Sequence, residues 1–254
     1  MKKREFVISI GLIVAYVAGL LVWDKVVPTS VEDSINTGIA WYYAGFSVLF
    51  VAYLAVSRGW RRVGLVGRDR TPAIRWVVVL YVIQAVLLAA FLGLVLSVYD
   101  GPSKVMTFIL INVVFIAFNE ELLFRGFLWD SLSGLRPAPA ILLTSLVFGL
   151  VHLINGVTGA AWNGVIVQVV FAAIGGLFDA VVRYGTGSLW PTILTHYLLD
   201  TAGSLGADTS MVGVGLGIQV LTVIAAILAV IIISIRYKDP VQPQASMPED
   251  AVAA

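Results

Sequence analysis

Residues 105–125 read VMTFILINVVFIAFNEELLFR, a long apolar run that ends in three charged side chains. The apolar part is long enough to cross the hydrocarbon core of a bilayer, which needs about 20 residues of α-helix. The charged side chains are those of Glu120, Glu121 and Arg125. Because ionisable groups are costly in lipid, this end of the segment is a candidate functional site.

The composition of the whole chain is typical of a membrane protein. Of the 254 residues, 59% belong to the AVILMFWYC set and 12% are charged, and the mean hydropathy is +0.96. Soluble domains carry about 25% charged residues, so this chain lacks the polar surface of a soluble protein. The net charge of +1, with basic residues confined to loops, argues against a nucleic-acid partner. The absence of cysteine excludes disulfides, thiol catalysis and cysteine-bound metals.

The hydrophobic segments predict an all-α, polytopic membrane helix bundle with about eight transmembrane helices. The predicted spans are 6–23, 38–57, 74–98, 105–124, 140–154, 163–182, 188–207 and 212–235. The fifth span is short, and the seventh contains Pro191, Gly203 and Gly206. We therefore expect that either of these two spans could be tilted, broken or re-entrant.

The distribution of basic residues predicts the orientation, because Lys and Arg accumulate in cytoplasmic loops. With the N-terminus inside, 13 of the 16 basic residues are cytoplasmic: Lys2, Lys3, Arg4, Arg58, Arg61, Arg62, Arg68, Arg70, Arg75, Arg136, Arg183, Arg236 and Lys238. We therefore predict an integral protein of a prokaryotic plasma membrane with both termini in the cytoplasm. A single membrane-embedded domain, 1–238, is expected to precede a disordered cytoplasmic tail, 239–254, which is rich in proline and small polar residues.

Three polar signatures lie within the apolar spans, and they include both histidines of the chain. They are EELLFR at 120–125, FGLVH at 148–152 and HYLLD at 196–200, on predicted spans four, five and seven. Side chains four residues apart lie on the same face of a helix. This spacing pairs Glu121 with Arg125, Phe148 with His152, and His196 with Asp200. The helix rise of 1.5 Å per residue allows the signatures to meet in the cytoplasmic half of the membrane.

The spacing also divides the two adjacent carboxylates into different environments. Glu121 is neutralised by Arg125, whereas Glu120 points elsewhere, into a cavity, and is the candidate general base. Each signature alone could instead hold helices together through an ion pair or a hydrogen bond. This structural interpretation is favoured for Asp179 and Arg183, which have the same spacing. It also holds for the amide side chains of Gln84, Asn112, Asn163, Gln168 and Gln219.

The order EExxxR, FxxxH and HxxxD on three separate membrane spans resembles the CAAX protease and bacteriocin-processing family of intramembrane glutamic endopeptidases, also called Abi proteins. By motif the resemblance covers residues 105–203, and by span count it covers the whole chain. The third motif of the family reads HxxxN or HxxxD, so Asp200 is the variant form.

The resemblance implies peptide hydrolysis by direct attack of water, without an acyl-enzyme, a metal or another cofactor. It implies that Glu120 activates the water with the assistance of His152. His196 and Asp200 would orient the substrate carbonyl and stabilise the oxyanion. The remaining motif residues, Glu121, Arg125 and Phe148, would support the site. The expected partner is a peptide or protein substrate at the membrane, such as a prenylated protein or a leader peptide.

Two other classes of function stay open from the residues alone. Two histidines and a carboxylate are sufficient ligands for a catalytic zinc ion, although the HExxH motif is absent. A non-catalytic membrane protein could use Glu120 and His152 as a proton relay in transport, or could bind peptides as a scaffold.

Overall fold

The computed structural model describes residues 2–26, 40–57, 59–66, 74–207 and 209–241. Its helices are α1 (Lys3–Val26), α3 (Trp41–Ser57), α4 (Arg75–Val98), α5 (Ser103–Glu121), η1 (Leu122–Leu128), α6 (Trp129–Ser131), α7 (Pro137–Val151), α8 (Ile154–Val157), α9 (Trp162–Thr186), α10 (Trp190–Gly206) and α11 (Val212–Arg236). Because α5, η1 and α6 follow one another without a break, a single helix of 29 residues runs from Ser103 to Ser131.

The polytopic helical architecture is confirmed, while the number of crossings stays a prediction. In the described part of the chain, six helices are long and apolar enough to span a membrane, among them α4, α9 and α11. The two remaining predicted spans coincide with α3 and α10, which have 17 residues each. Large apolar side chains such as Val79, Ile166 and Leu221 are exposed on the outside of the bundle, as expected for a surface that faces lipid.

The predicted seventh span is one continuous helix, although it contains proline and glycine. Pro191 lies in the first turn of α10, where its missing N–H has no helical acceptor in any case. Gly203 and Gly206 lie in the last turns and do not interrupt the helix. The fifth span is longer than predicted: α7 ends at Val151, but together with the following turn and α8 it forms an apolar segment of 21 residues, Pro137–Val157.

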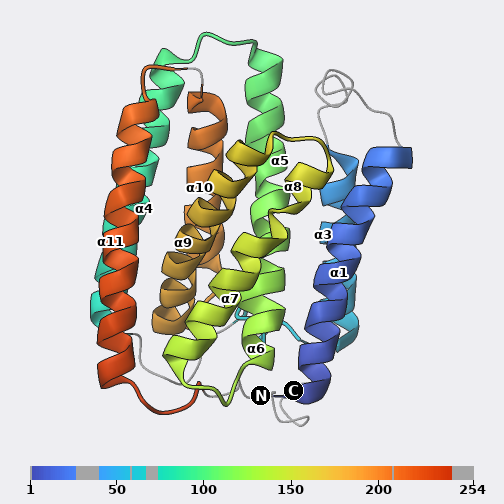
Figure 1. The fold of residues 1–254 in the computed structure, drawn as a ribbon, viewed down its shortest axis with the longest axis vertical. Helices are drawn as coiled ribbons and strands as arrows, with labels where there is room; N and C mark the ends of the chain where they lie inside the picture. The colour runs from blue at the N-terminus through green and yellow to red at the C-terminus, as the bar shows by residue number, and fades with distance from the viewer. Residues whose placement is uncertain (1, 27–39, 58, 67–73, 208, 242–254) are drawn as a thin grey trace, which may run out of the picture.

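The helix 103–131 and α10 occupy the interior of the bundle (Figure 1). α10 packs against α4 and α5, α7 and α11 pack against α9, and α3 packs against α5. The span window of helix 103–131 is 44% buried, compared with 17% for α1. α7 approaches α9 closely at Gly149, where a Cβ atom would lie 2.6 Å from the Cβ atom of Ala173. Glycine at this helix contact is therefore required by the packing.

The helix that carries the first signature is not a regular α-helix throughout. From Leu122 to Leu128 it is a π-helix, and all seven residues of this segment are buried. The backbone N–H of Trp129 donates to the carbonyls of Phe124 and Gly126. In a regular α-helix this N–H would donate to the carbonyl of Arg125. The sequence analysis assumed an α-helix here, and π-helical turns are frequent at functional sites.

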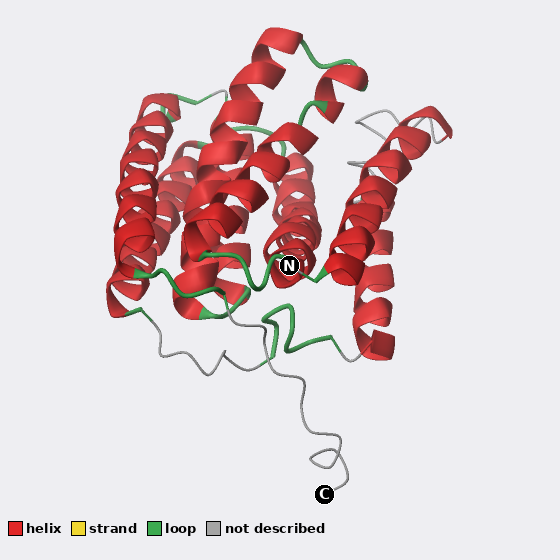
Figure 2. Ribbon diagram, turned by 60° about the horizontal axis from the view of Figure 1, so that its bottom comes forward, coloured by secondary structure: helices red, strands yellow, loops and turns green. Residues whose placement is uncertain are grey.

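Both ends of the described chain lie at one end of the bundle. The N–H of Lys2 donates to the carbonyl of Ser131 at 3.0 Å, and the N–H of Gly134 donates to the carbonyl of Val241 at 2.9 Å. The Asp130 carboxylate binds Lys2 Nζ at 2.9 Å and Arg62 Nη2 at 2.8 Å. Figure 2 shows the loops of this end in green. The arrangement agrees with an even number of crossings, whereas the side of the membrane stays a prediction.

Of the tail predicted at 239–254, the structure describes residues 239–241. Val241 is buried, and its N–H donates to the carbonyl of Leu135 at 2.8 Å. Val241 therefore packs on the bundle, whereas Asp239 and Pro240 are exposed, and residues 242–254 of the predicted tail lie outside the described part of the chain.

Candidate active site

The ion pair predicted inside the first signature is present at the junction of α5 and η1. Arg125 Nη1 donates to Glu121 Oε1 at 2.9 Å, and both side chains are fully buried. The Arg125 guanidinium also lies over the ring of Phe148, with its Cζ atom 4.2 Å from the ring centroid. The guanidinium is thus held by a carboxylate from its own helix and by an aromatic face from α7.

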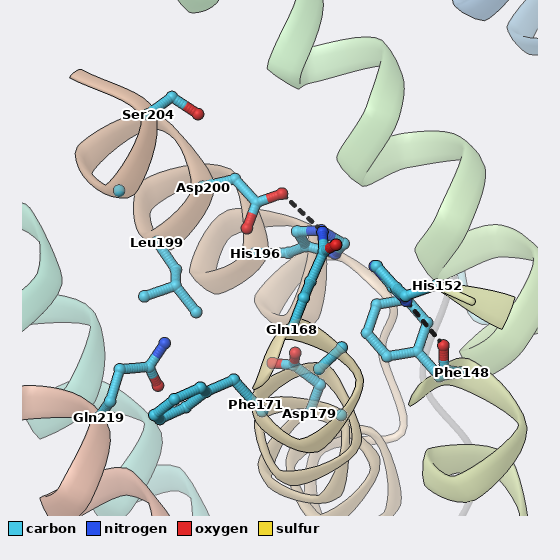
Figure 3. Close-up of a pocket in the computed structure, with 14 residues that line it drawn as sticks. Phe148, His152, Gln168, Phe171, Asp179, His196, Leu199, Asp200, Ser204 and Gln219 are labelled. Atoms are coloured by element: carbon cyan, nitrogen blue, oxygen red, sulfur yellow. Dashed lines mark hydrogen bonds and ion pairs between the residues drawn. The ribbon is translucent and has the colours of Figure 1, made fainter. Parts of the chain in front are cut away.

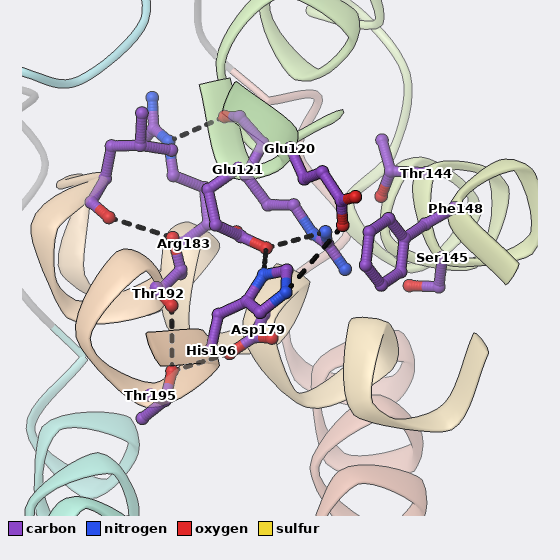
Figure 4. A network of polar contacts seen from close by, with 12 residues as sticks. Glu120, Glu121, Thr144, Ser145, Phe148, Asp179, Arg183, Thr192, Thr195 and His196 are labelled. Carbon is purple, nitrogen blue, oxygen red and sulfur yellow. Dashed lines mark hydrogen bonds and ion pairs between the residues drawn. The ribbon is translucent and has the colours of Figure 1, made fainter. Parts of the chain in front are cut away.

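His196 of α10 is surrounded by carboxylates (Figure 4). Its Nδ1 atom lies 3.0 Å from Glu121 Oε1, and its Nε2 atom lies 3.2 Å from Asp200 Oδ2. Nε2 also lies 3.7 Å from Glu120 Oε2. Ionised carboxylates only accept hydrogen bonds, so this environment favours a proton on each ring nitrogen of His196.

His152 follows the last residue of α7 and faces the same centre. Its Nδ1 atom lies 2.9 Å from the backbone carbonyl of Phe148. Because a carbonyl oxygen is an acceptor, Nδ1 carries the hydrogen of this bond, which leaves Nε2 to face the site. The Phe148 ring lies between the histidines, with centroid distances of 5.0 Å to His152 and 5.8 Å to His196.

Two adjoining cavities give the polar side chains access to a substrate. The smaller, of about 200 Å³, is lined by Glu120, His152 and Asp200 and by apolar and tyrosine side chains of α1, α3 and α5. The larger, of about 340 Å³, lies between α7, α9, α10 and α11 and is lined by His152, His196 and Asp200 (Figure 3). His152, Gln168 and Asp200 line both cavities.

The three signatures therefore meet in one place, as the sequence analysis requires. Glu120, His152, His196 and Asp200, the four predicted catalytic residues, all line one or both cavities. The contacts inside the cluster differ from those expected in one respect. Glu121 was expected to support Arg125, but the same carboxylate oxygen also contacts His196. A contact between residues 75 positions apart gives no local signal in the sequence.

Two polar side chains that line the cavities, Asp179 and Gln168, were not predicted to belong to the site. Asp179 lines the larger cavity and accepts a hydrogen bond from the Thr195 hydroxyl at 2.8 Å. Gln168 lines both cavities, and its side-chain oxygen accepts a hydrogen bond from Asn155 at 2.8 Å. The available signal was the presence of Asp179 and Gln168 inside an apolar span, which the sequence analysis attributed to helix packing.

The geometry of a metal site is absent from the residues that the structure describes. Within them, no three His, Asp or Glu side chains are grouped so that they could hold a metal ion.

The fold and this cluster define a polytopic helical membrane protein with a buried centre of carboxylates and histidines. Residues 102–202, which contain all three signatures, match the family model described as Rce1-like, type II CAAX prenyl endopeptidase Rce1-like. Residues 102–202 are thus similar to the Rce1-like CAAX prenyl endopeptidase family, which is part of the CAAX protease and bacteriocin-processing group. No curated protein and no solved structure gives a significant match.

Proposed function

We propose that this protein is an intramembrane endopeptidase in which Glu120 activates water for direct attack on a peptide bond. The observation that carries the proposal is the meeting of Glu120, His152 and His196, from three separate helices, around cavities inside a family-matched segment. Ionisable groups gathered at one point inside a membrane domain are costly, and a catalytic role explains their presence.

Glu120 is placed to act as the general base. Its side chain is 17% exposed, whereas that of Glu121 is fully buried and bound to Arg125. The smaller cavity, of about 200 Å³, is large enough for a water molecule beside Glu120 and His152. The free Nε2 atom of His152 accepts a hydrogen bond from this water and orients it towards the substrate. General-base catalysis of this kind contributes about 10²- to 10⁴-fold to the rate.

His196 is placed to stabilise the negative charge that develops on the carbonyl oxygen. Glu121 fixes the ring through Nδ1, so the Nε2–H group is directed towards the cavity side of α10. Asp200, whose side chain is 42% exposed, accepts a hydrogen bond from Nε2 in the free protein, and in the proposed mechanism the substrate carbonyl oxygen takes its place as the acceptor. Removal of one such donor typically lowers kcat by about 10²- to 10³-fold.

The protons balance in this sequence of steps. Glu120 takes one proton from water as the oxygen of the water forms a bond to the carbonyl carbon. The carbonyl oxygen becomes an oxyanion that accepts a hydrogen bond from His196. Collapse of the intermediate breaks the C–N bond, and Glu120 returns its proton to the leaving amine.

The substrate class that fits is a peptide or protein segment that reaches the site from the membrane. Both cavities lie among the helices of a bundle whose exterior is apolar. A segment carrying an apolar side chain or a lipid group partitions to this surface. Prenylated proteins and membrane-bound leader peptides both meet this requirement.

The test is cleavage of a panel of membrane-associated peptides by the purified protein in detergent or nanodiscs. We expect cleavage that is abolished by Glu120→Gln and by His152→Gln, and retained when the same change is made in Glu5→Gln, outside the site. Cleavage should also survive a zinc chelator. Proteolysis unchanged by Glu120→Gln would contradict the mechanism, and chelator-sensitive proteolysis would indicate a metalloprotease. Proton-coupled flux in liposomes without any cleavage would indicate a transporter.

A further inference from the structure

Asp179 and Arg183 lie one turn apart on α9, and each has a polar partner on a different helix. The sequence analysis favoured a structural ion pair between them. In the structure, Asp179 Oδ1 accepts a hydrogen bond from Thr195 of α10 at 2.8 Å. Arg183 Nε donates to the backbone carbonyl of Arg125 in η1 at 3.0 Å. Both side chains are buried, with Arg183 only 1% exposed.

The contact of Arg183 is explained by the π-helix. The carbonyl of Arg125 is the group to which Trp129 N–H would donate in a regular α-helix, but this N–H donates to Phe124 and Gly126 instead. Arg183 supplies a charged donor to that carbonyl from another helix. The buried Arg183 therefore donates a hydrogen bond to the backbone of the same residue, Arg125, whose side chain binds Glu121.

The loop 59–66 encloses the Arg183 side chain. Gly64 has a φ of +83°, and a Cβ atom at this position would lie 2.8 Å from Arg183 Nη2. The carbonyl of Gly64 accepts a hydrogen bond from the N–H of Leu189, directly before α10, at 2.9 Å. The Arg183 guanidinium thus lies between the π-helix and the loop 59–66, which is itself hydrogen-bonded to the residue before α10.

The contact of Asp179 fixes the residue next to His196. The Thr195 hydroxyl has one hydrogen and three acceptors in reach: Asp179 Oδ1 at 2.8 Å and the carbonyls of Pro191 and Thr192, both at 3.1 Å. A carboxylate is the strongest acceptor of the three and is also the nearest, so the hydroxyl donates to Asp179. This bond attaches the first half of α10 to α9, directly beside His196.

We propose that Asp179 and Arg183 are positioning residues that set the distance between Glu121 and His196, the proposal resting on the peptidase function given above. Glu121 belongs to the helix that Arg183 holds, and His196 belongs to the helix that Asp179 holds (Figure 4). α9 is therefore a common frame for the two helices. Neither positioning residue belongs to the three signatures.

The first test is the kinetics of Thr195→Val, which removes the hydroxyl while keeping the shape of the side chain, against Thr195→Ser, which keeps the hydroxyl. We expect kcat to fall by about 10- to 100-fold in Thr195→Val, because small misplacements of catalytic groups have effects of this size. KM should stay within about twofold, since the lost stabilisation belongs to the transition state. Thr195→Ser should retain a kcat close to that of the wild type. An equal loss in both variants would overturn the proposal.

The second test does not depend on activity. The chain has two histidines, so the imidazole ¹⁵N spectrum has few signals, and His152→Gln assigns them. We expect the His196 signals to shift in Thr195→Val and in Arg183→Gln, while Thr195→Ser leaves them unchanged. The His152 signals should stay in place. Unchanged His196 signals in folded Thr195→Val would refute the proposal, even if Arg183→Gln does not fold. A wild-type protein that cleaves no peptide would refute the peptidase function, whereas the His196 signals would still test the positioning.

Discussion

Replacing Arg125 by methionine should destabilise the protein strongly, because it would leave a carboxylate buried without its main partner. Glu121 is fully buried, and its Oε1 atom lies 2.9 Å from Arg125 Nη1. The second partner of that oxygen, His196, is shared with Asp200. Methionine has similar length and no charge, so the change removes the guanidinium without opening a large cavity.

The expected cost is about 3–5 kcal/mol, which is the range for removing one partner of a buried ion pair. The cation–π contact of Arg125 with Phe148, at 4.2 Å, is also lost, and such contacts contribute about 2 kcal/mol when desolvated. Because the contacts share one guanidinium, their energies are not additive. A loss of 3–5 kcal/mol corresponds to about a 10²- to 10⁴-fold change in the unfolding equilibrium.

The assay is reversible unfolding of the purified protein in mixed micelles, applied to Arg125→Met, Glu121→Gln and the double variant. The double variant should lose less stability than the two single variants together, with a coupling energy of about 1–3 kcal/mol. Arg61→Met is the matched control, since Arg61 is exposed and surface changes alter stability by about 0.5 kcal/mol or less. The reasoning is refuted if Arg125→Met is as stable as Arg61→Met, or if the single effects simply add.

Three further predictions concern pH, an ion-pair cluster and a loop. Proteolysis should decline as the pH falls, because Glu120 acts as a base only when deprotonated; a rate that keeps rising below about pH 4, where model carboxylates become protonated, would contradict this role. Asp130→Asn removes the charge that pairs with Lys2 and Arg62, and it should lower the free energy of unfolding by only about 0.5–1 kcal/mol, because both partners are about a third exposed. The loss should shrink at high salt, and a loss independent of salt would argue against an electrostatic cause. Gly64→Ala should lower the free energy of unfolding by about 1–3 kcal/mol, because φ is +83° and the new methyl group meets Arg183. The control is Gly45→Ala, where nothing lies within 4 Å of the added Cβ. Equal thermal stability of the two variants would show that the loop does not confine Arg183.

The helical fold was predictable because each membrane span must bury its own backbone hydrogen bonds and present apolar side chains to lipid. The predicted span 212–235 and α11 (Val212–Arg236) agree almost to the residue for this reason. The seventh span, for which a tilted, broken or re-entrant helix was considered, is one unbroken helix, because Pro191 falls in the first turn, where the helix tolerates it.

The sequence by itself determined the contacts within single helices. Side chains four residues apart face the same way whatever surrounds them, so the pairs Glu121–Arg125 and His196–Asp200 were visible from spacing alone and are present. The same argument placed Phe148 beside His152.

Only the tertiary structure decided which of these pairs meet. The contact of Glu121 with His196 depends on how α5 and α10 are rotated and how closely they approach, and these depend on packing along the whole bundle. The π-helix at 122–128 likewise lies where Arg183, 58 positions away from Arg125, donates to the Arg125 carbonyl, which does not accept the regular α-helical bond from Trp129. Spacing along one chain segment carries no information about such partners. The sequence therefore provided the chemical groups of the site, and the packing around α9 decided their geometry.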